Sequence, residues 1–190
     1  MKLRNLWLWP ALAIAAASAA CGDPTGLKAT LETVQDTLVV FALNGTAPLA
    51  PTALNTPTHT VVQADPASGF DVAFDVNEAG QAVIYPLKLV DSEFGTVRPV
   101  GLLKVAGAYE SVLSAPSSGY GYDSALVALP GEVVVVQAQG QPFCNLDPIT
   151  TVYSKLTVDS VDTSSRTVHF RMTVDPNCGF RSFAPGVPDK

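Results

Sequence analysis

Histidine is scarce in this sequence, which limits the hydrolytic chemistry open to it. Only His59 and His169 occur among 190 residues. A serine or cysteine nucleophile usually needs a histidine base beside it. The chain has no Gly-x-Ser-x-Gly nucleophile motif that either histidine could serve. We therefore expect no catalytic residues of the triad type.

Positive charge and phosphate-binding motifs are also lacking. The formal net charge is −6, and the first 20 residues hold two cations and no acidic residue, so the remainder carries −8. Nucleic acids and anionic membranes repel such an acidic domain. We expect no nucleic-acid partner, and membrane contact only through a covalent anchor. The glycines of residues 119–122 lack the companions of a phosphate or dinucleotide loop, and no cofactor is expected.

The first 20 residues have the three parts of a secretory signal peptide. Lys2 and Arg4 form a positively charged start, an apolar stretch runs from Leu6 into alanines, and small residues precede Cys21. The apolar stretch, about 15 residues, is shorter than the roughly 20 that a membrane-spanning helix needs. We predict an exported protein from which residues 1–20 are removed.

The last residues of this segment, Ser18-Ala19-Ala20-Cys21, resemble the lipobox of bacterial lipoprotein signal peptides, with Ser18 where leucine is usual. The resemblance covers the leader only. It implies a diacylglyceryl group on the Cys21 sulfur, cleavage before Cys21, acylation of the new N-terminus, and a location in the bacterial cell envelope on the periplasmic or surface-facing side of a membrane. The alternative is ordinary signal-peptidase cleavage near Ala20, which leaves Cys21 as a thiol.

The chain has three cysteines, an odd number for an oxidising compartment. If Cys21 carries lipid, Cys144 and Cys178 remain as a pair. The alternating segments 152–160 and 166–174 lie between them, and folding these into a hairpin brings both cysteines together. We predict a disulfide, because two cysteines are too few for a structural zinc site.

Alternation of polar and apolar residues predicts strands in most of the chain. It is clearest in Thr167–Val174 and in Phe70–Val76, which is followed by a turn and a returning strand over Gln81–Val90. Glu132–Gln139 contains four consecutive valines and reads as a strand that is covered on both faces. Weaker strand patterns occupy Leu27–Val34, Thr37–Leu43, His59–Gln63, Val97–Val105, Ala108–Ser114 and Tyr122–Leu129.

Many short strands separated by Gly, Pro, Asn and Asp are typical of a sandwich. We predict an all-β, mostly antiparallel two-sheet sandwich with about ten strands, immunoglobulin-like only in the loose architectural sense. A tether over residues 21–26 precedes one domain over 27–183, and an extended tail follows over 184–190. Residues 44–58 form the longest connection expected to lack regular structure.

One acidic cluster is a candidate calcium site. Asp71, Asp75 and Asn77 share one face of the predicted strand by the period-2 rule, and Glu78 follows in the turn. Oxygen ligands that converge at a turn can hold Ca²⁺. The cluster lacks the closing bidentate glutamate of a calcium loop, and a solvated acidic hairpin explains it equally well.

Tyr120 and Tyr122 are the candidate binding residues. Both tryptophans, Trp7 and Trp9, fall in the leader, so an aromatic platform for a glycan or protein partner depends on tyrosines. Serines and glycines around Tyr120 and Tyr122 favour an exposed aromatic loop. The alternative is that both rings pack on the rim of the sandwich.

These observations favour a cell-envelope lipoprotein with a non-catalytic binding or structural module. Two alternatives stay open. One is a small envelope hydrolase whose carboxylates come together only in the fold. The other is an assembly or adhesion subunit that presents a sheet edge to its neighbours.

Overall fold

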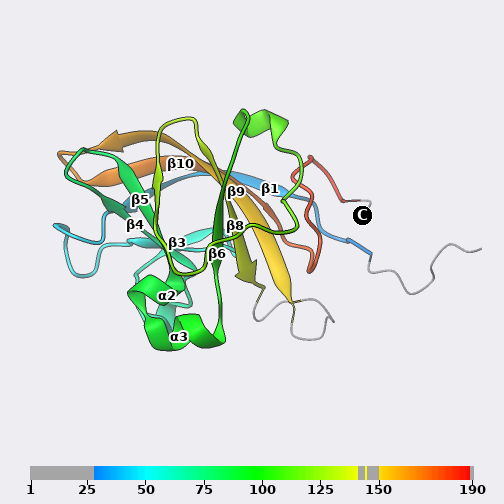
Figure 1. Ribbon diagram of the computed structural model, residues 1–190, viewed down its shortest axis with the longest axis horizontal. Helices are drawn as coiled ribbons and strands as arrows, with labels where there is room; N and C mark the ends of the chain where they lie inside the picture. Colours follow the sequence, from blue (N-terminus) through cyan, green and yellow to red (C-terminus); the bar gives the residue numbers. More distant parts are fainter. Residues whose placement is uncertain (1–27, 141–143, 145–149, 189–190) are drawn as a thin grey trace, which may run out of the picture.

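The computed structural model of the chain describes residues 28–140, 144 and 150–188. These residues form ten strands in two antiparallel five-stranded sheets (Figure 1). The first sheet has the order β1 (Val34–Phe41), β10 (Thr167–Asp175), β9 (Thr151–Asp162), β8 (Val133–Gln139) and β6 (Gly101–Val105). The second has the order β3 (Thr60–Val62), β2 (Ala53–Asn55), β4 (Val72–Val76), β5 (Ala82–Pro86) and β7 (Leu126–Ala128). The predicted all-β sandwich is confirmed.

Alternate side chains of both sheets fill the space between them. Phe74 of β4 stacks on Phe170 of β10, with ring centroids 4.9 Å apart, and both rings are fully buried. Full burial of one such side chain stabilises the fold by about 1.5–3 kcal/mol. Because Phe74 points inward, Asp71 and Asp75 lie on the opposite face of the β4 chain.

The outer face of the first sheet carries a second, smaller apolar cluster. The 3-10 helix η3 (Tyr109–Ser111) and Phe183 cover it. Lys155 of β9 lies beneath them and donates to the carbonyls of Tyr109 and Val112 at 2.6 and 2.9 Å. Burial lowers the pKa of this ammonium group. β8 is therefore covered on both faces, as its run of valines predicted.

A disulfide joins Cys144 and Cys178, whose Cα atoms are 5.7 Å apart. The β9–β10 hairpin lies between them in the sequence and brings them together, so the predicted pairing is confirmed. Cys144 is fully buried in the main core.

The strand predicted over Gln81–Val90 is wrong in its second half. β5 ends at Pro86, and only its first three residues, 82–84, pair with β7. The short helix α2 (Leu87–Val90) follows directly after Pro86. Asp91 then begins α3 (Ser92–Val97), because its carboxylate accepts the backbone N–H groups of Glu93 and Phe94.

Three further expectations are corrected. Residues 44–58 contain β2, a strand too short to give a recognisable alternation. Ala108–Ser114 contains η3 and covers the first sheet instead of pairing with it. Residues 28–33 of the predicted strand Leu27–Val34 are not strand, whereas the strand predicted over Thr37–Leu43 is confirmed up to Phe41 as part of β1, which starts at Val34.

The sandwich has two distinct ends (Figure 1). The segment that leads into β1 and the C-terminal segment lie at one end, which we call the junction end, formed by residues 28–33, 112–115 and 181–188. The cyan loop after β1, the β4–β5 turn and the β9–β10 turn lie at the opposite end. We call this the turn end, formed by residues 42–51, 75–81 and 162–166.

At the junction end, part of the predicted tail is attached to the domain. The carbonyls of Ala184 and Gly186 accept bonds from the Thr33 hydroxyl and backbone N–H, at 2.8 and 3.0 Å. Within the described ranges, no helix is long and apolar enough to cross a membrane.

Candidate functional site

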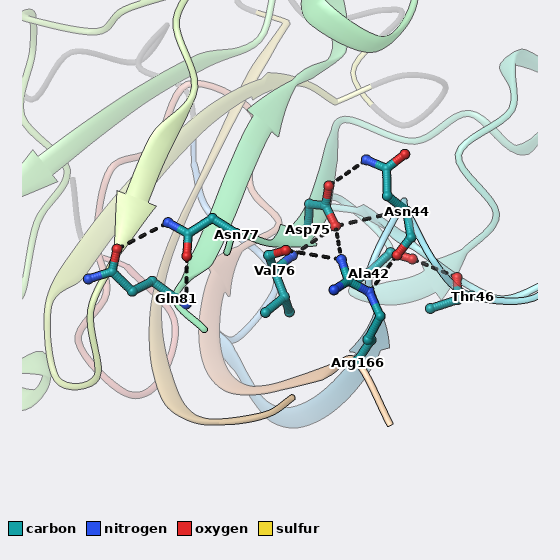
Figure 2. Close-up of polar contacts among 8 residues, drawn as sticks. All are labelled: Ala42, Asn44, Thr46, Asp75, Val76, Asn77, Gln81 and Arg166. Carbon is teal, nitrogen blue, oxygen red and sulfur yellow. Dashed lines mark hydrogen bonds and ion pairs between the residues drawn. The ribbon is translucent and has the colours of Figure 1, made fainter. Parts of the chain in front are cut away.

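Three turns meet at the turn end, and the Arg166 side chain joins them (Figure 2). Its Nε donates to the Asn44 carbonyl at 2.6 Å. One terminal nitrogen donates to Asp75 Oδ1 and to the Val76 carbonyl, both at 3.0 Å. One guanidinium group thus connects the loop after β1 to the end of β4, from a position in the β9–β10 turn.

Asp75 is the acceptor at the centre of this cluster. Besides Arg166, its carboxylate accepts the Asn44 side-chain amide at 2.6 Å and its neighbour's backbone N–H at 2.8 Å. The residue is only 7% exposed, so these bonds replace the water that the carboxylate loses on burial. The Asp75 charge is satisfied within the domain.

The loop after β1 has the sequence that this arrangement requires. Asn44 precedes Gly45, which has a φ of +73° and lies under the arginine. A Cβ atom at Gly45 would lie 2.9 Å from Arg166 Nε. The Thr46 hydroxyl closes the turn by donating to the Ala42 carbonyl at 2.6 Å. A side chain at Gly45 would therefore displace the guanidinium group.

The rest of this loop forms the exposed part of the turn end. Leu49 is 80% exposed. Two open hollows flank it, of about 430 and 340 Å³, and Thr46, Ala47, Leu49 and Ala50 line both. Phe41 and Ser165 complete the wall of the first hollow. The turn end thus combines an internally paired charge cluster with an exposed leucine between two hollows.

Asn77 and Glu78 do not join the Asp75 cluster. The Asn77 amide donates to the Gln81 side chain at 3.0 Å, and its carbonyl oxygen accepts the Gln81 backbone N–H at 2.9 Å (Figure 2). Glu78 is exposed at the tip of the turn. These bonds close the β4–β5 hairpin.

Asp71 lies at the other end of β4, with partners of its own. One oxygen accepts the Thr56 backbone N–H at 2.7 Å, and the other lies 3.4 Å from Arg98 Nη1. Its side chain is completely buried, and burial raises its pKa to about 6 despite the arginine. Arg98 also donates to the carbonyls of Gly69 and Phe70.

The four residues of the predicted calcium site therefore face different partners. Asp71 and Asp75 each contact an arginine, and they share no hydrogen-bond partner. In the described part of the chain, no three metal-ligating His, Cys, Asp or Glu side chains come together.

The structure places Tyr120 and Tyr122 over Gly101 at the start of β6. The Tyr120 hydroxyl donates to the Pro116 carbonyl at 2.9 Å, and the Tyr122 hydroxyl to the Gln137 side chain at 2.5 Å. Burial raises the pKa of the Tyr120 hydroxyl. Both hydroxyls are used inside the domain, and Tyr122, 37% exposed, offers only part of its ring.

The two histidines have different partners. His59 has a φ of +45°, and its Nδ1 lies 2.5 Å from a carboxylate oxygen of Asp36, which links the edge of one sheet to the edge of the other. His169 lies half-buried in β10, opposite Val39 of β1. Neither belongs to the turn end.

No protein-family model, curated protein or solved structure matches the chain. The site therefore has to be interpreted from its own geometry. The turn end positions its charged groups against one another and exposes a leucine between hollows.

Sequence reasoning missed Arg166 and Asn44. Asn44-Gly45 is a recognisable turn signal, but nothing in the sequence links it to a residue 122 positions away. The predicted lipid-attachment residue, Cys21, and the signal peptide lie outside the described residues.

Proposed function

We propose that the chain is a lipid-anchored protein of the bacterial cell envelope whose sandwich is a non-catalytic binding or structural module. The main support for this proposal is that the N-terminal segment and the turns joined by Arg166 lie at opposite ends of the domain. The first described residues, 28–33, lie at the junction end, and the turns joined by Arg166 lie at the opposite end (Figure 1). An anchor at Cys21 therefore precedes the end of the domain that lies opposite these turns.

The pairing of the carboxylates supports a non-catalytic role. A glycoside hydrolase that uses two carboxyl groups needs them to face one substrate, about 5–10 Å apart. Asp71 and Asp75, the two buried carboxylates of β4, instead each contact an arginine at separate ends of that strand.

The composition of the turn end supports a role in binding. The loop residues 44–51 carry no charge, so a partner that covers this loop does not dehydrate a charged side chain of the loop. Leu49 supplies an apolar side chain that the fold leaves exposed. A protein or a glycan is the partner class that this surface suits.

The anchor is tested by expressing the full chain and its Cys21→Ala variant in a bacterium supplied with labelled palmitate. For the wild type we expect incorporation of label, membrane association, and an intact mass that fits diacylglyceryl and acyl groups on Cys21. Cys21→Ala should lose the label and the membrane association. Both proteins keep Cys144 and Cys178, so the disulfide is a matched internal control. Unlabelled wild-type protein in the soluble fraction would refute the anchor.

A further inference from the structure

Three large aliphatic side chains are exposed at the junction end, on three separate segments. Leu31 is 53% exposed, Leu113 is 54% exposed and Val187 is 47% exposed. Single exposed aliphatic residues are normal on a protein surface, whereas a group at one place marks an interaction site.

Hydrogen bonds hold these three segments to one another and to the sandwich. The bonds are Thr33 N to Gly186 O at 3.0 Å, Phe183 N to Leu113 O at 2.8 Å, and Leu31 N to Asn177 Oδ1 at 3.0 Å. Asn177 is 7% exposed, and its amide also donates to the Leu31 carbonyl at 2.8 Å. The three aliphatic residues are therefore carried by backbone that the fold fixes.

The length of chain before the domain keeps this end close to any lipid on Cys21. Cys21 and Lys28 are seven residues apart, a span of at most about 25 Å when fully extended. Exposed charges at the junction end are Lys28, Arg181 and Glu32, which leaves it locally positive on a strongly acidic domain. The reach suits contact with the bilayer that holds the lipid, and the excess of one positive charge at this end lessens the repulsion between an acidic domain and anionic lipid.

We propose that the junction end docks on the bilayer, with Leu31, Leu113 and Val187 inserted at the boundary between headgroups and acyl chains. This proposal rests on the proposed lipid anchor. Apolar side chains buried at that boundary add to the affinity of an acyl anchor. The anchored domain is then held upright on the membrane, with the turn end outward, instead of swinging on its tether.

The sequence offers a clean test, because both tryptophans, Trp7 and Trp9, precede Cys21. A single tryptophan placed in the lipidated protein reports on its own surroundings. We compare Leu113→Trp at the junction end with Leu49→Trp at the turn end, in vesicles of phosphatidylcholine and phosphatidylglycerol with and without brominated acyl chains. We expect Leu113→Trp to shift its emission to shorter wavelength and to lose emission to brominated lipid, while Leu49→Trp does neither.

Each other outcome has a defined meaning. Intact mass establishes first whether Cys21 carries lipid, and a chain without lipid refutes the anchor of the proposed function. With lipid present, the same behaviour at both tryptophans overturns the docking alone. A blue shift of Leu113→Trp in lipid-free protein, in buffer that holds neither vesicles nor detergent, identifies contact between protein chains and also overturns it. Leu31→Trp repeats the test from a second segment, and thermal melting checks that each variant is folded.

Discussion

At the scale of single residues, Asp71 combines complete burial with incomplete pairing. One of its oxygens accepts a short backbone bond, whereas Arg98 approaches the other only to 3.4 Å. Burial disfavours the ionised carboxylate more than the arginine favours it, so the pKa rises from 3.8 to about 6. Ionised Asp71 therefore destabilises the folded state at neutral pH.

The sign of the resulting pH dependence follows from linkage. A raised folded-state pKa gives stability that is present below pH 3.8 and lost as the pH rises through 6. We expect wild-type protein to lose about 3 kcal/mol of unfolding free energy from this group between pH 3 and pH 7. Asp71→Asn removes the titration, and the comparison by urea denaturation isolates it from other groups. Parallel pH profiles for the two proteins would contradict this assignment.

Arg166 combines three hydrogen bonds with an unfavourable backbone, since its φ is +53°. Arg166→Ala and Arg166→Gly both remove the guanidinium group, and each should destabilise the domain by about 2 kcal/mol through lost bonds to buried partners. Glycine adopts positive φ freely, so Arg166→Gly should be more stable than Arg166→Ala by about 1 kcal/mol. Denaturant unfolding measures both values. Equal stability of the two variants would mean that the backbone conformation carries no cost.

At the scale of elements, α2 and α3 pack so closely that Gly95 has no room for a side chain. A Cβ atom there would lie 2.2 Å from the Lys88 Cα. Intrinsic helix propensity favours alanine over glycine by about 1 kcal/mol, but overpacking costs about 1–3 kcal/mol. We expect Gly95→Ala to lower the melting temperature and Thr96→Ala, on the exposed side of α3, to leave it unchanged. A stabilised Gly95→Ala would show that the two helices move apart easily.

The elements that were predicted well are those whose pattern is set by burial on one or both faces. β10 and β4 alternate because one face meets the core. β8 is continuously apolar because Val134 and Val136 enter the main core and Val133 and Val135 enter the second cluster. The prediction failed over Ala108–Ser114 and 87–90, where apolar residues cover a sheet or form a single helical turn. Local alternation does not distinguish these roles.

The candidate site was less predictable for a related reason. Asp75 was recognised as a strand residue beside a turn, but its partners Asn44 and Arg166 are 31 and 91 positions away. Such contacts depend on strand order, which a single sequence does not fix. The Cys144–Cys178 pairing was predictable because one hairpin connects the two residues.

At the scale of the whole molecule, the two ends of the sandwich differ in charge and in exposed apolar groups. The junction end carries Lys28, Arg181, Glu32 and three aliphatic residues. The turn end carries the exposed Glu78 and Asp162 beside an uncharged loop with Leu49. The tryptophan comparison proposed above tests this division directly, because it places one probe at each end. A response of Leu113→Trp without one of Leu49→Trp would support membrane contact at the junction end and leave the turn end accessible to a partner.

The direction of β1 has a mechanical consequence. This strand runs from the junction end to the turn end and pairs antiparallel with β10 from Val34 to Phe41. Its ladder bonds lie perpendicular to that direction. A pull between an anchor at one end and a partner at the other therefore loads these bonds in shear, all at once, instead of opening them one by one. The domain is built to transmit tension along its longest edge strand.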